Sequence, residues 1–385
     1  MFPVKPAAPE GNAQKTAAPH RAPGGKVRIA LWDNSQFILM LLVVIGHTLS
    51  TVRTDSGLAF AIYAYIYLFH MPAMLLTSGY FAKAQVNPKA ARSALGLIAT
   101  WLVFEGIWAL LRYLTIGKPL SDHFLVAPAW SLWFLVTLAT MKILLPYIAR
   151  LRAPLTVSVI LALAAGLSPA IGVDFSASRT LCFLPFFVAG WLVKKRGWLD
   201  GDWFRHPGPL LRAAAAGVLL SVAAAFVIFP RLRGDIRIDR WLTWRDDYAT
   251  LLNLDGWAEP VTGILIRGGL LLVAAVMTLA LLVLVPRGQS RISVWGTRTL
   301  YVYLLHGFFI FGLRTTGAID RLDDLGVGGT VALIALAAAI TVLLSSAPVA
   351  RLTRRLIEPR FTRLFRAEQA DPRASSTGTL PVTRQ

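Results

Sequence analysis

The sequence has little acidic charge and only one cysteine. Its 385 residues include 20 Asp and Glu against 39 Lys and Arg; charged residues make up only 15% of the chain, whereas hydrophobic residues make up 56%. A soluble domain of this length needs more surface charge. The single Cys182 excludes a disulfide framework and leaves the redox compartment undetermined, and its apolar neighbours predict a small core residue. The composition therefore predicts a protein with many membrane-spanning segments.

Signatures of several protein classes are also missing from the sequence. It contains no His-x-x-x-His pattern, no cysteine pair and no cluster of Asp and Glu within one apolar segment, so we expect no bound metal. A Gly-x-Ser-x-Gly elbow and a phosphate-binding Gly-rich loop are absent as well. Basic residues do not gather in a separate, aromatic-rich soluble module, which argues against nucleic acid as a partner.

Long hydrophobic runs are the main feature present, and they predict the fold. A run of about 20 apolar residues spans the ~30 Å hydrocarbon core of a bilayer as an α-helix. We therefore expect an all-α, polytopic membrane helix bundle of about ten transmembrane helices. The fifth and sixth segments are short and are interrupted by Pro169 and Pro185. The ten segments are residues 31–51, 58–81, 93–113, 129–149, 154–173, 179–195, 210–229, 261–285, 298–315 and 329–350.

The distribution of basic residues predicts the orientation of the bundle. With the N-terminus inside, the inner segments carry more than twice as many Lys and Arg residues as the outer segments, as the positive-inside rule requires. Both termini are then cytoplasmic, and the net charge of +19 belongs to loops that face anionic lipid. Residues 1–27 lack the apolar core of a signal peptide and are expected to be a disordered cytoplasmic tail. Residues 28–350 form the membrane domain, and residues 351–385 form a basic, partly disordered cytoplasmic tail.

The first apolar segment carries polar groups on one helical face. Asp33, Gln36, Met40 and His47 recur at helical spacing after the basic Arg28. Gln36 and His47 are separated by about 16 Å along such a helix, which is half of the hydrocarbon core. This helix therefore connects polar groups at one membrane surface with an imidazole deep in the bundle.

Few other ionisable side chains lie inside the predicted spans. Such groups are costly in lipid and usually face the bundle interior or a wet cavity. Lys142 either extends to the membrane surface or pairs with Glu105, and Arg267 lies near the outer end of its span, where headgroups are accessible. A lone histidine in a bundle is more often structural than catalytic, and the structural interpretation is favoured for His70 and His306. For His47, the surrounding pattern favours a functional interpretation.

The longest predicted outer loop, residues 230–260, mixes charged and aromatic residues. It contains five arginines, six carboxylates and four large aromatic residues, among them Trp244 and Trp257. Two interpretations remain equally open for this loop. It either folds over the outer face and contributes to sugar binding, or it is a solvated loop beside an interfacial belt of aromatic residues.

Five short motifs follow one another in a fixed order along the first 306 residues. None is decisive alone, but together they resemble the acyltransferase 3 family of integral-membrane O-acyltransferases, and within it the branch that includes fucose 4-O-acetylases. The motifs are Trp32-Asp33-Asn34 followed by Val43-Val44-Ile45-Gly46-His47; Phe69-His70-Met71-Pro72 followed by Ser78-Gly79-Tyr80-Phe81; Trp130-Ser131-Leu132-Trp133-Phe134-Leu135; Leu184-Pro185-Phe186-Phe187-Val188-Ala189-Gly190; and Tyr301-Val302-Tyr303-Leu304-Leu305-His306.

The resemblance implies transfer of an acyl group, most often acetyl, from acyl-CoA to a hydroxyl of a sugar or glycoconjugate at the bacterial cytoplasmic membrane. By position, His47 matches the catalytic histidine of the family, and Asp33 on the same face is a second catalytic candidate. Lys89 and Arg92 resemble the basic pair that meets the acyl donor. Further candidates for substrate binding or for a structural role are His70, Glu105, Trp130, Trp133 and His306.

The chemistry implied by the resemblance suits a buried imidazole. A sugar hydroxyl is a poor nucleophile at neutral pH, and a neutral imidazole is well matched to removing its proton. Burial disfavours the charged form of a histidine, and a water-poor site protects a thioester from hydrolysis. An intermediate in which the acyl group is carried by the histidine is a second mechanism that the sequence leaves open.

One position departs from the family pattern. Members commonly carry Lys or Arg eleven residues before the histidine, where this chain has Gln36. An amide forms hydrogen bonds but carries no charge for a CoA phosphate. Either Lys26 or Arg28 supplies the cation, or donor binding differs, or activity is reduced. A catalytically inactive relative with a scaffold role and a transporter or flippase are therefore the alternatives to an acyltransferase.

Overall fold

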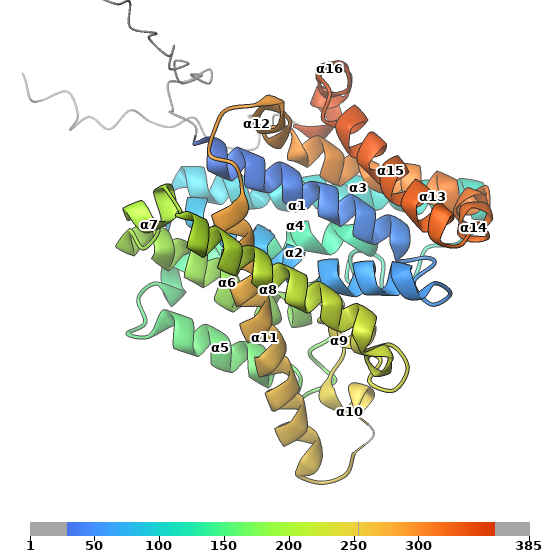
Figure 1. Ribbon diagram of the computed structural model, residues 1–385. Helices are drawn as coiled ribbons and strands as arrows, with labels where there is room; N and C mark the ends of the chain where they lie inside the picture. Colours follow the sequence, from blue (N-terminus) through green and yellow to red (C-terminus); the bar gives the residue numbers. More distant parts are fainter. Residues whose placement is uncertain (1–28, 253, 359–385) are drawn as a thin grey trace, which may run out of the picture.

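The computed structural model describes residues 29–252 and 254–358, and within these ranges all regular structure is helical (Figure 1). Eight helices are long and apolar enough to cross a membrane, and each coincides with one of the predicted spans. These helices are α1 (Ala30–Leu49), α2 (Gly57–Phe81), α3 (Pro88–Ile116), α4 (Trp133–Ile148) extended by η1 (Trp130–Leu132), α6 (Ala177–Arg196) preceded by η2 (Asp174–Ser176), α8 (Pro209–Ile228), α11 (Ala258–Leu284) and α15 (Val327–Leu344).

The remaining two predicted spans correspond to shorter helices. The ninth is α13 (Thr299–Thr315), with 17 residues, and the fifth is α5 (Pro154–Ala164), with only 11. Connecting segments contain further short helices, and α16 follows the last long one. They are α7 (Asp202–Arg205), η3 (Pro230–Leu232), α9 (Ile238–Trp241), α10 (Tyr248–Leu251), α12 (Arg291–Gly296), α14 (Ala318–Asp323) and α16 (Ala347–Ile357).

Local sequence signals set the limits of several helices. The Ser56 side chain accepts a hydrogen bond from the backbone N–H of Ala59 at the start of α2, and Asn87 caps α3 in the same way. Such caps satisfy backbone donors that have no partner within the helix. Pro88 occupies the first turn of α3, where its missing N–H costs nothing. Gly117 ends this helix with a φ of 63°, a backbone conformation that glycine adopts without steric penalty.

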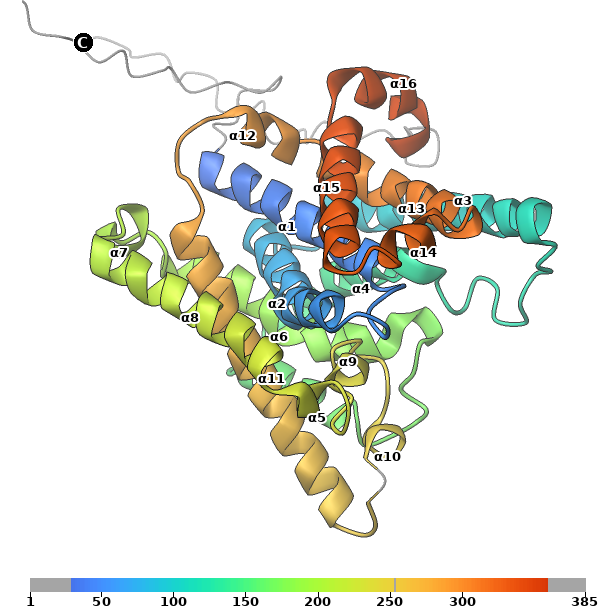
Figure 2. The same ribbon diagram turned by 45° about the vertical axis from the view of Figure 1, so that its right-hand side comes forward.

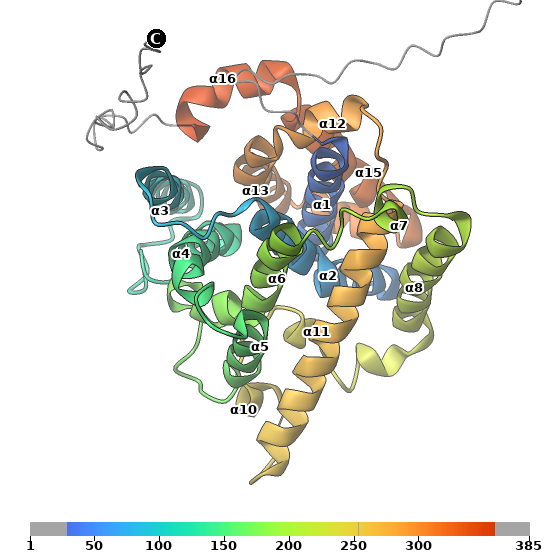
Figure 3. The ribbon, with the colours of Figure 1, turned by 90° about the vertical axis from the view of Figure 1, so that its left-hand side faces the viewer.

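Helices α1, α2 and α6 form the centre of the bundle. In each, 78% of the most apolar 18-residue window is buried, against 6% in α8. Figure 3 shows α1 and α2 between α3, α4 and α5 on one side and α8 on the other. The side chains of α8 are thus left to face lipid, whereas α1 and α2 are surrounded by protein and can carry polar groups.

Two glycines allow α2 and α6 to pack closely. A Cβ atom at Gly79 would lie 1.9 Å from the carbonyl oxygen of Phe187, and one at Gly190 would lie 2.0 Å from that of Leu76. Real Cβ atoms do not approach a backbone oxygen to such distances. Small residues let membrane helices approach with their backbones in contact, so this pair of glycines fixes the crossing of α2 and α6.

When the shorter α5 and α13 are counted with the eight longer helices, consecutive helices alternate in direction, which gives the bundle two ends (Figure 2). The end where α1 begins also contains the C-terminus of α2, and the rings of Trp32 and Tyr80 lie 4.1 Å apart there. We call it the proximal end. At the opposite, distal end, the Arg314 guanidinium at the end of α13 donates to the carbonyl oxygen of His47. By the charge distribution, the proximal end is the one that we expect in the cytoplasm.

The predicted helix over 154–173 is wrong in its length, because α5 ends at Ala164. The loop between α8 and α11, which we call the distal loop, packs against this point. Tyr248 donates its backbone N–H to the carbonyl of Gly166 (2.8 Å) and its hydroxyl to that of Leu163 (2.7 Å). Burial raises the pKa of Tyr248 to about 12, so its hydroxyl remains a donor. A Cβ atom on Gly166 would lie 2.4 Å from this tyrosine ring, so the absence of a side chain there admits the loop.

The tails predicted at the two chain ends lie mostly outside the described residues. The predicted tail 1–27 falls entirely outside them, together with the donor-site candidate Arg28. Of the predicted tail 351–385, residues 351–357 are the end of α16, which projects beyond the bundle at the proximal end in Figure 2. The rest of that prediction concerns residues beyond 358.

The close crossing of α2 and α6 gives a first prediction. Gly190→Ala forces a methyl group against the Leu76 carbonyl, and overpacking of this kind costs about 1–3 kcal/mol or more. We expect Tm, measured on the purified protein by loss of monodisperse elution after heating, to fall by roughly 5 °C or more. Gly106→Ala in α3 is the matched control, since nothing lies within 4 Å of its Cβ position and alanine is the better helix former. Equal Tm values for the two variants would contradict this account of the crossing.

The orientation of the bundle gives a second prediction. In a Cys182→Ala background, Gln85→Cys probes the proximal end and Asp255→Cys the distal loop; both positions are exposed. A membrane-impermeant maleimide added to intact cells is expected to label position 255 and not position 85, and both after permeabilisation. The opposite labelling pattern would place the N-terminus outside.

Candidate active site

A cavity of about 220 Å³ lies at the centre of the bundle and opens towards the distal end. Its inner wall is apolar, with Met40 from α1 and Met71 and Met74 from α2. Its distal rim is polar, with Arg53 and Arg179 as its two cations. His47 and His70 lie between these two regions. From its inner wall to its distal rim, the cavity therefore has an apolar part, two imidazoles and two cations.

His47 takes part in a chain of hydrogen bonds that joins α1 to α13. Its Nδ1 lies 2.9 Å from Nε2 of His306, and Nδ1 of His306 lies 2.9 Å from the carbonyl oxygen of Val302. A carbonyl oxygen only accepts, so His306 donates from Nδ1 and its Nε2 is an acceptor when the ring is neutral. His47 must then donate from Nδ1. The chain leaves Nε2 of a neutral His47 with a free lone pair.

The surroundings of His47 fix its ring position. Gly46 lets α2 approach, since a Cβ there would lie 3.0 Å from the ring of Tyr67. The rings of Trp130 and Tyr67 lie 4.8 and 6.2 Å from that of His47, measured between centroids. At the end of α1, Arg314 donates to the His47 carbonyl and to the Ser50 hydroxyl. The imidazole is held between aromatic rings and has little freedom to rotate.

His70 is the second histidine of the cavity. Its Nδ1 lies 2.7 Å from the carbonyl oxygen of Ile66, so it donates from Nδ1 and keeps Nε2 as an acceptor when neutral. Its ring lies 5.0 Å from that of Tyr67, which separates it from His47. Pro72 follows within the same continuous helix. The hydrogen bond to Ile66 satisfies the buried Nδ1–H donor and leaves Nε2 available to a ligand.

Trp130 reaches the cavity from a strained backbone position. Its φ of 34° lies in the left-handed region, which costs a large non-glycine residue about 1–3 kcal/mol. The Glu105 carboxylate holds the preceding turn by accepting from the N–H of Ala129 (2.9 Å) and is itself held by the Trp101 indole N–H (3.0 Å). Tyr303 donates to the next carbonyl, that of Ser131, at 2.6 Å. These buried contacts keep the Trp130 ring beside His47 against the strain.

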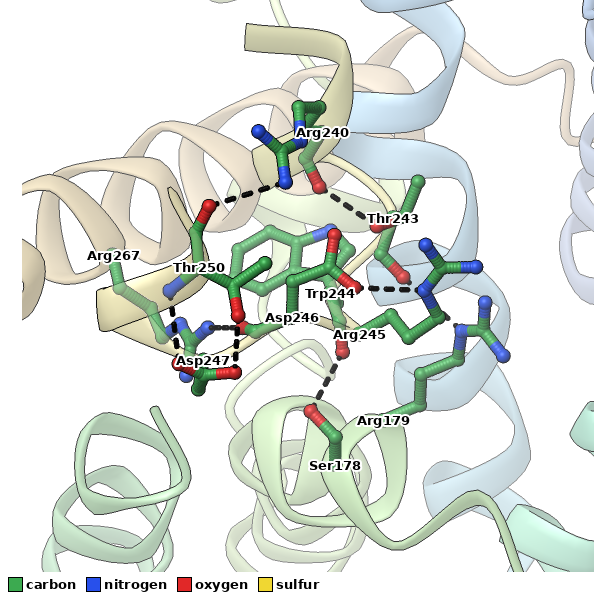
Figure 4. Close-up of polar contacts among 10 residues, drawn as sticks. All are labelled: Ser178, Arg179, Arg240, Thr243, Trp244, Arg245, Asp246, Asp247, Thr250 and Arg267. Carbon is green, nitrogen blue, oxygen red and sulfur yellow. Dashed lines mark hydrogen bonds and ion pairs between the residues drawn. The ribbon is translucent and has the colours of Figure 1, made fainter. Parts of the chain in front are cut away.

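The distal loop closes the rim of the cavity. Thr243 and Trp244 line it together with Arg179, and Figure 4 shows how these residues meet. Ser178 in α6 donates to the carbonyl of Trp244 (3.0 Å), and the Arg179 Nε–H donates to that of Thr243 (3.1 Å). Trp244 is 1% exposed and Trp257 87%. Both ends of the loop are exposed, whereas its middle, residues 238–248, is largely buried against the site. The loop is thus not a belt of interfacial aromatic residues.

The structure excludes one of the two alternatives for Lys142 and corrects the expectation for Arg267. Lys142 donates to the Ser93 hydroxyl (2.9 Å) and does not pair with Glu105, whose carboxylate is occupied by the Trp130 turn. Arg267 does not face lipid headgroups: it is 2% exposed, donates to the Asp246 carbonyl (2.9 Å) and lies over the Tyr248 ring. In both places the partner, the Ser93 hydroxyl or the Asp246 carbonyl, comes from another segment and could not be identified from the sequence.

The structure brings some of the candidate residues together and separates others. His47, His70, Trp130 and Trp133 all line the cavity, and His306 lies directly behind His47. Glu105 does not line the cavity; it holds the backbone of Ala129, the residue before Trp130. Four candidates lie towards the proximal end and do not line the cavity; they are Asp33, Gln36, Lys89 and Arg92.

Asp33 is far from His47 along α1. The two are fourteen residues apart on one straight helix, a rise of about 21 Å, so they cannot contact the same reacting atoms. Asp33 is buried. Arg92 and Lys89 begin α3 at the same end, near a groove whose wall contains Lys83, Arg150 and Lys195. Cations therefore gather at the proximal end, where the sequence predicts the donor to arrive.

Several cavity residues were not singled out in the sequence. Tyr67 comes from α2, Arg53 from the α1–α2 connection and Arg179 from α6, and the two arginines were counted only as outer-loop charge. Trp244 was noted only as one of the aromatic residues of the loop 230–260. The one signal available was the mixture of arginine and tryptophan in the distal loop. In the part of the chain that the structure describes, no three or more His, Cys, Asp and Glu side chains gather in a way that could hold a metal ion.

An all-helical bundle with eight membrane-length helices and a buried histidine pair beside a cavity defines a multi-pass membrane protein with an internal site. The chain matches the model of the acyltransferase domain of the acyltransferase 3 family over residues 29–349. It therefore belongs to this family and is a membrane acyltransferase by family. No curated protein and no solved structure matches the chain.

Proposed function

We propose that this protein transfers an acetyl group from acetyl-CoA, or a related acyl group from its CoA thioester, to a hydroxyl of a sugar or glycoconjugate, with His47 as general base. The observation that supports this most directly is the hydrogen-bond chain from Val302 through His306 to His47. It leaves a basic nitrogen facing a cavity in a member of an acyltransferase family.

The proposed reaction balances as a direct transfer. Nε2 of His47 takes the proton of the acceptor hydroxyl as its oxygen attacks the thioester carbonyl carbon. A C–O bond forms and the C–S bond breaks. The imidazolium then returns the proton to the departing CoA thiolate. General-base catalysis of this kind contributes about 10²–10⁴-fold to a rate.

His306 has a positioning function in this scheme. Its Nε2 accepts a hydrogen bond from the Nδ1–H group of His47 and so fixes the tautomer in which Nε2 of His47 carries the lone pair. The same contact stabilises the positive charge that forms on His47 during the reaction, because the second imidazole spreads it towards the Val302 carbonyl. The carboxylate of a Ser-His-Asp triad orients its histidine in a comparable way.

The two substrates would enter from opposite ends. The CoA part of the donor would lie at the proximal end, where Lys89, Arg92 and the nearby groove lysines supply charge and Gln36 an amide. The acyl group would then reach the apolar wall of Met40, Met71 and Met74. A sugar acceptor would enter from the distal end, where the aromatic side chains of Trp130 and Trp133 line the cavity. This arrangement agrees with the resemblance to sugar O-acetylases.

The central experiment measures CoA release and acyl transfer by the purified protein in lipid nanodiscs. Acetyl-CoA is the donor and a mixture of methyl glycosides the acceptor, with mass spectrometry of the products. Appearance of an acetyl-sized increment on a glycoside supports the proposal. Absence of CoA release with every acceptor would favour the alternatives of a transporter or an inactive scaffold with Gln36 in place of a cation.

The base is tested by His47→Asn. The asparagine amide overlaps the Nδ1 position and can still donate to His306, but nothing replaces Nε2. We expect kcat to fall by roughly 10²–10⁴-fold with an unchanged Tm. Turnover near that of the wild type at equal amounts of folded protein would remove His47 from the mechanism, and His70 would then be the next base to test.

His306 is tested by a pair of variants. His306→Gln keeps an acceptor oxygen near the Nε2 position, whereas His306→Leu removes the acceptor and leaves the tautomer of His47 unfixed. We expect kcat of the Leu variant to fall by about 10²-fold or more, and the Gln variant to recover most of it, with similar KM values for acetyl-CoA. If both variants lost activity equally, or if kcat followed Tm alone, the positioning function would be rejected.

A further inference from the structure

The two cations at the distal rim of the cavity differ in how their charge is compensated. Arg53 lies 3.5 Å from the carboxylate of Asp239. Arg179 has no carboxylate within ion-pair distance among the residues that the structure describes. Its Nε–H donates to the Thr243 carbonyl (3.1 Å), and its guanidinium lies over the Trp133 ring at 4.8 Å. Its terminal N–H groups form no hydrogen bond within the described chain and remain available to a ligand.

The carboxylates nearest to Arg179 are already paired. Asp239 is shared between Arg53 and Arg237 (3.3 Å), and Asp246 binds Arg245 at 2.8 Å. Figure 4 shows the guanidinium of Arg245 next to that of Arg179, and the two repel each other. Four arginines thus surround these two carboxylates, and two of the four, Arg53 and Arg179, line the cavity. A partly buried cation beside another cation is costly unless an anion compensates it.

We propose that the distal rim binds an anionic group of the acceptor, so that the acceptor is an acidic or phosphorylated sugar and Arg179 recognises its carboxylate or phosphate. The inference rests on the proposed function, because it assigns the acceptor of the same cavity. A guanidinium binds either oxyanion through two parallel N–H groups. His47 and Arg179 line one cavity, so a single sugar ring can offer its hydroxyl to the histidine and its charge to the arginine.

Two contacts hold the Arg179 guanidinium in place. The Thr243 carbonyl anchors its Nε, and the Trp133 ring supports one face of the guanidinium. A cation held on two sides loses little further freedom when it binds a ligand. Arg179 lines the cavity, so its remaining donors are accessible to a ligand held there.

The experiment compares three acceptors that share one ring, using the full-length protein in nanodiscs. Methyl β-glucoside is neutral, methyl β-glucuronide carries a carboxylate, and methyl β-glucoside 6-phosphate carries a phosphate. Equilibrium binding by calorimetry and kcat/KM with acetyl-CoA are measured for each, and the two anionic arms distinguish a carboxylate from a phosphate. We expect the wild type to bind one anionic probe about ten-fold more tightly than the neutral one, and to show a similar ratio of kcat/KM values.

Variants then locate the recognition. In Arg179→Gln the ratio of anionic to neutral binding is expected to fall to near one, while Arg179→Lys keeps part of it. Arg240→Gln is the matched control, since Arg240 lies in the distal loop next to the rim and donates to the Thr250 carbonyl outside the cavity. It should keep the wild-type ratio.

Each outcome decides between the two proposals. A wild-type ratio near one, or a ratio unchanged in Arg179→Gln, would overturn the anionic acceptor and leave acyl transfer intact. Preferential binding that depends on Arg179, without CoA release from acetyl-CoA, would support the anion site and refute the proposed function.

Discussion

The hydrogen bond between His47 and His306 is the contact on which the site depends. It joins two helices that are 259 residues apart in the chain, inside a bundle whose other contacts are mainly apolar. An imidazole without a partner in such surroundings is costly. Because Val302 can only accept, the direction of every donor in the chain is fixed. One backbone carbonyl therefore determines that Nε2 of a neutral His47 carries the lone pair, and α1 and α13 must keep their register for the contact to persist.

The fold could be predicted from the sequence to the extent that it follows from helix length and hydrophobicity. The long apolar runs fixed eight helices near their observed limits, since such a run has one stable form in a bilayer. The fifth helix could not be predicted, because its end depends on Tyr248, which packs against Gly166 from a loop about eighty residues away. Periodicity reports the local chain only, whereas this helix ends where another segment enters the bundle.

The candidate site was also predictable only in part: the sequence identified His47, but not the residues that contact it from other helices. The motif around His47 identified a polar face on a buried helix, and the structure places that histidine in a cavity. Its partner could not be chosen from the sequence, since His70 and His306 both lie in apolar helices and only packing decides between them. Arg179 appeared as one more charge at a helix end, although it lines the cavity. A pair between Glu105 and Lys142 was one of two alternatives because both are charged, whereas a backbone N–H from the Trp130 turn satisfies the carboxylate.

The two parts of the cavity differ in how they are built. His47 and His306 lie on long helices of the bundle, and the close α2–α6 contact keeps the inner wall in place. Groups that react must be held within a fraction of an ångström, which rigid helices do better than loops. The rim is instead closed by the distal loop through single backbone hydrogen bonds from Ser178 and Arg179. Loops tolerate changes of sequence that a packed helix does not. Exchange of the loop residues at the rim would therefore alter the acceptor while the histidine chain, and with it the chemistry, is retained.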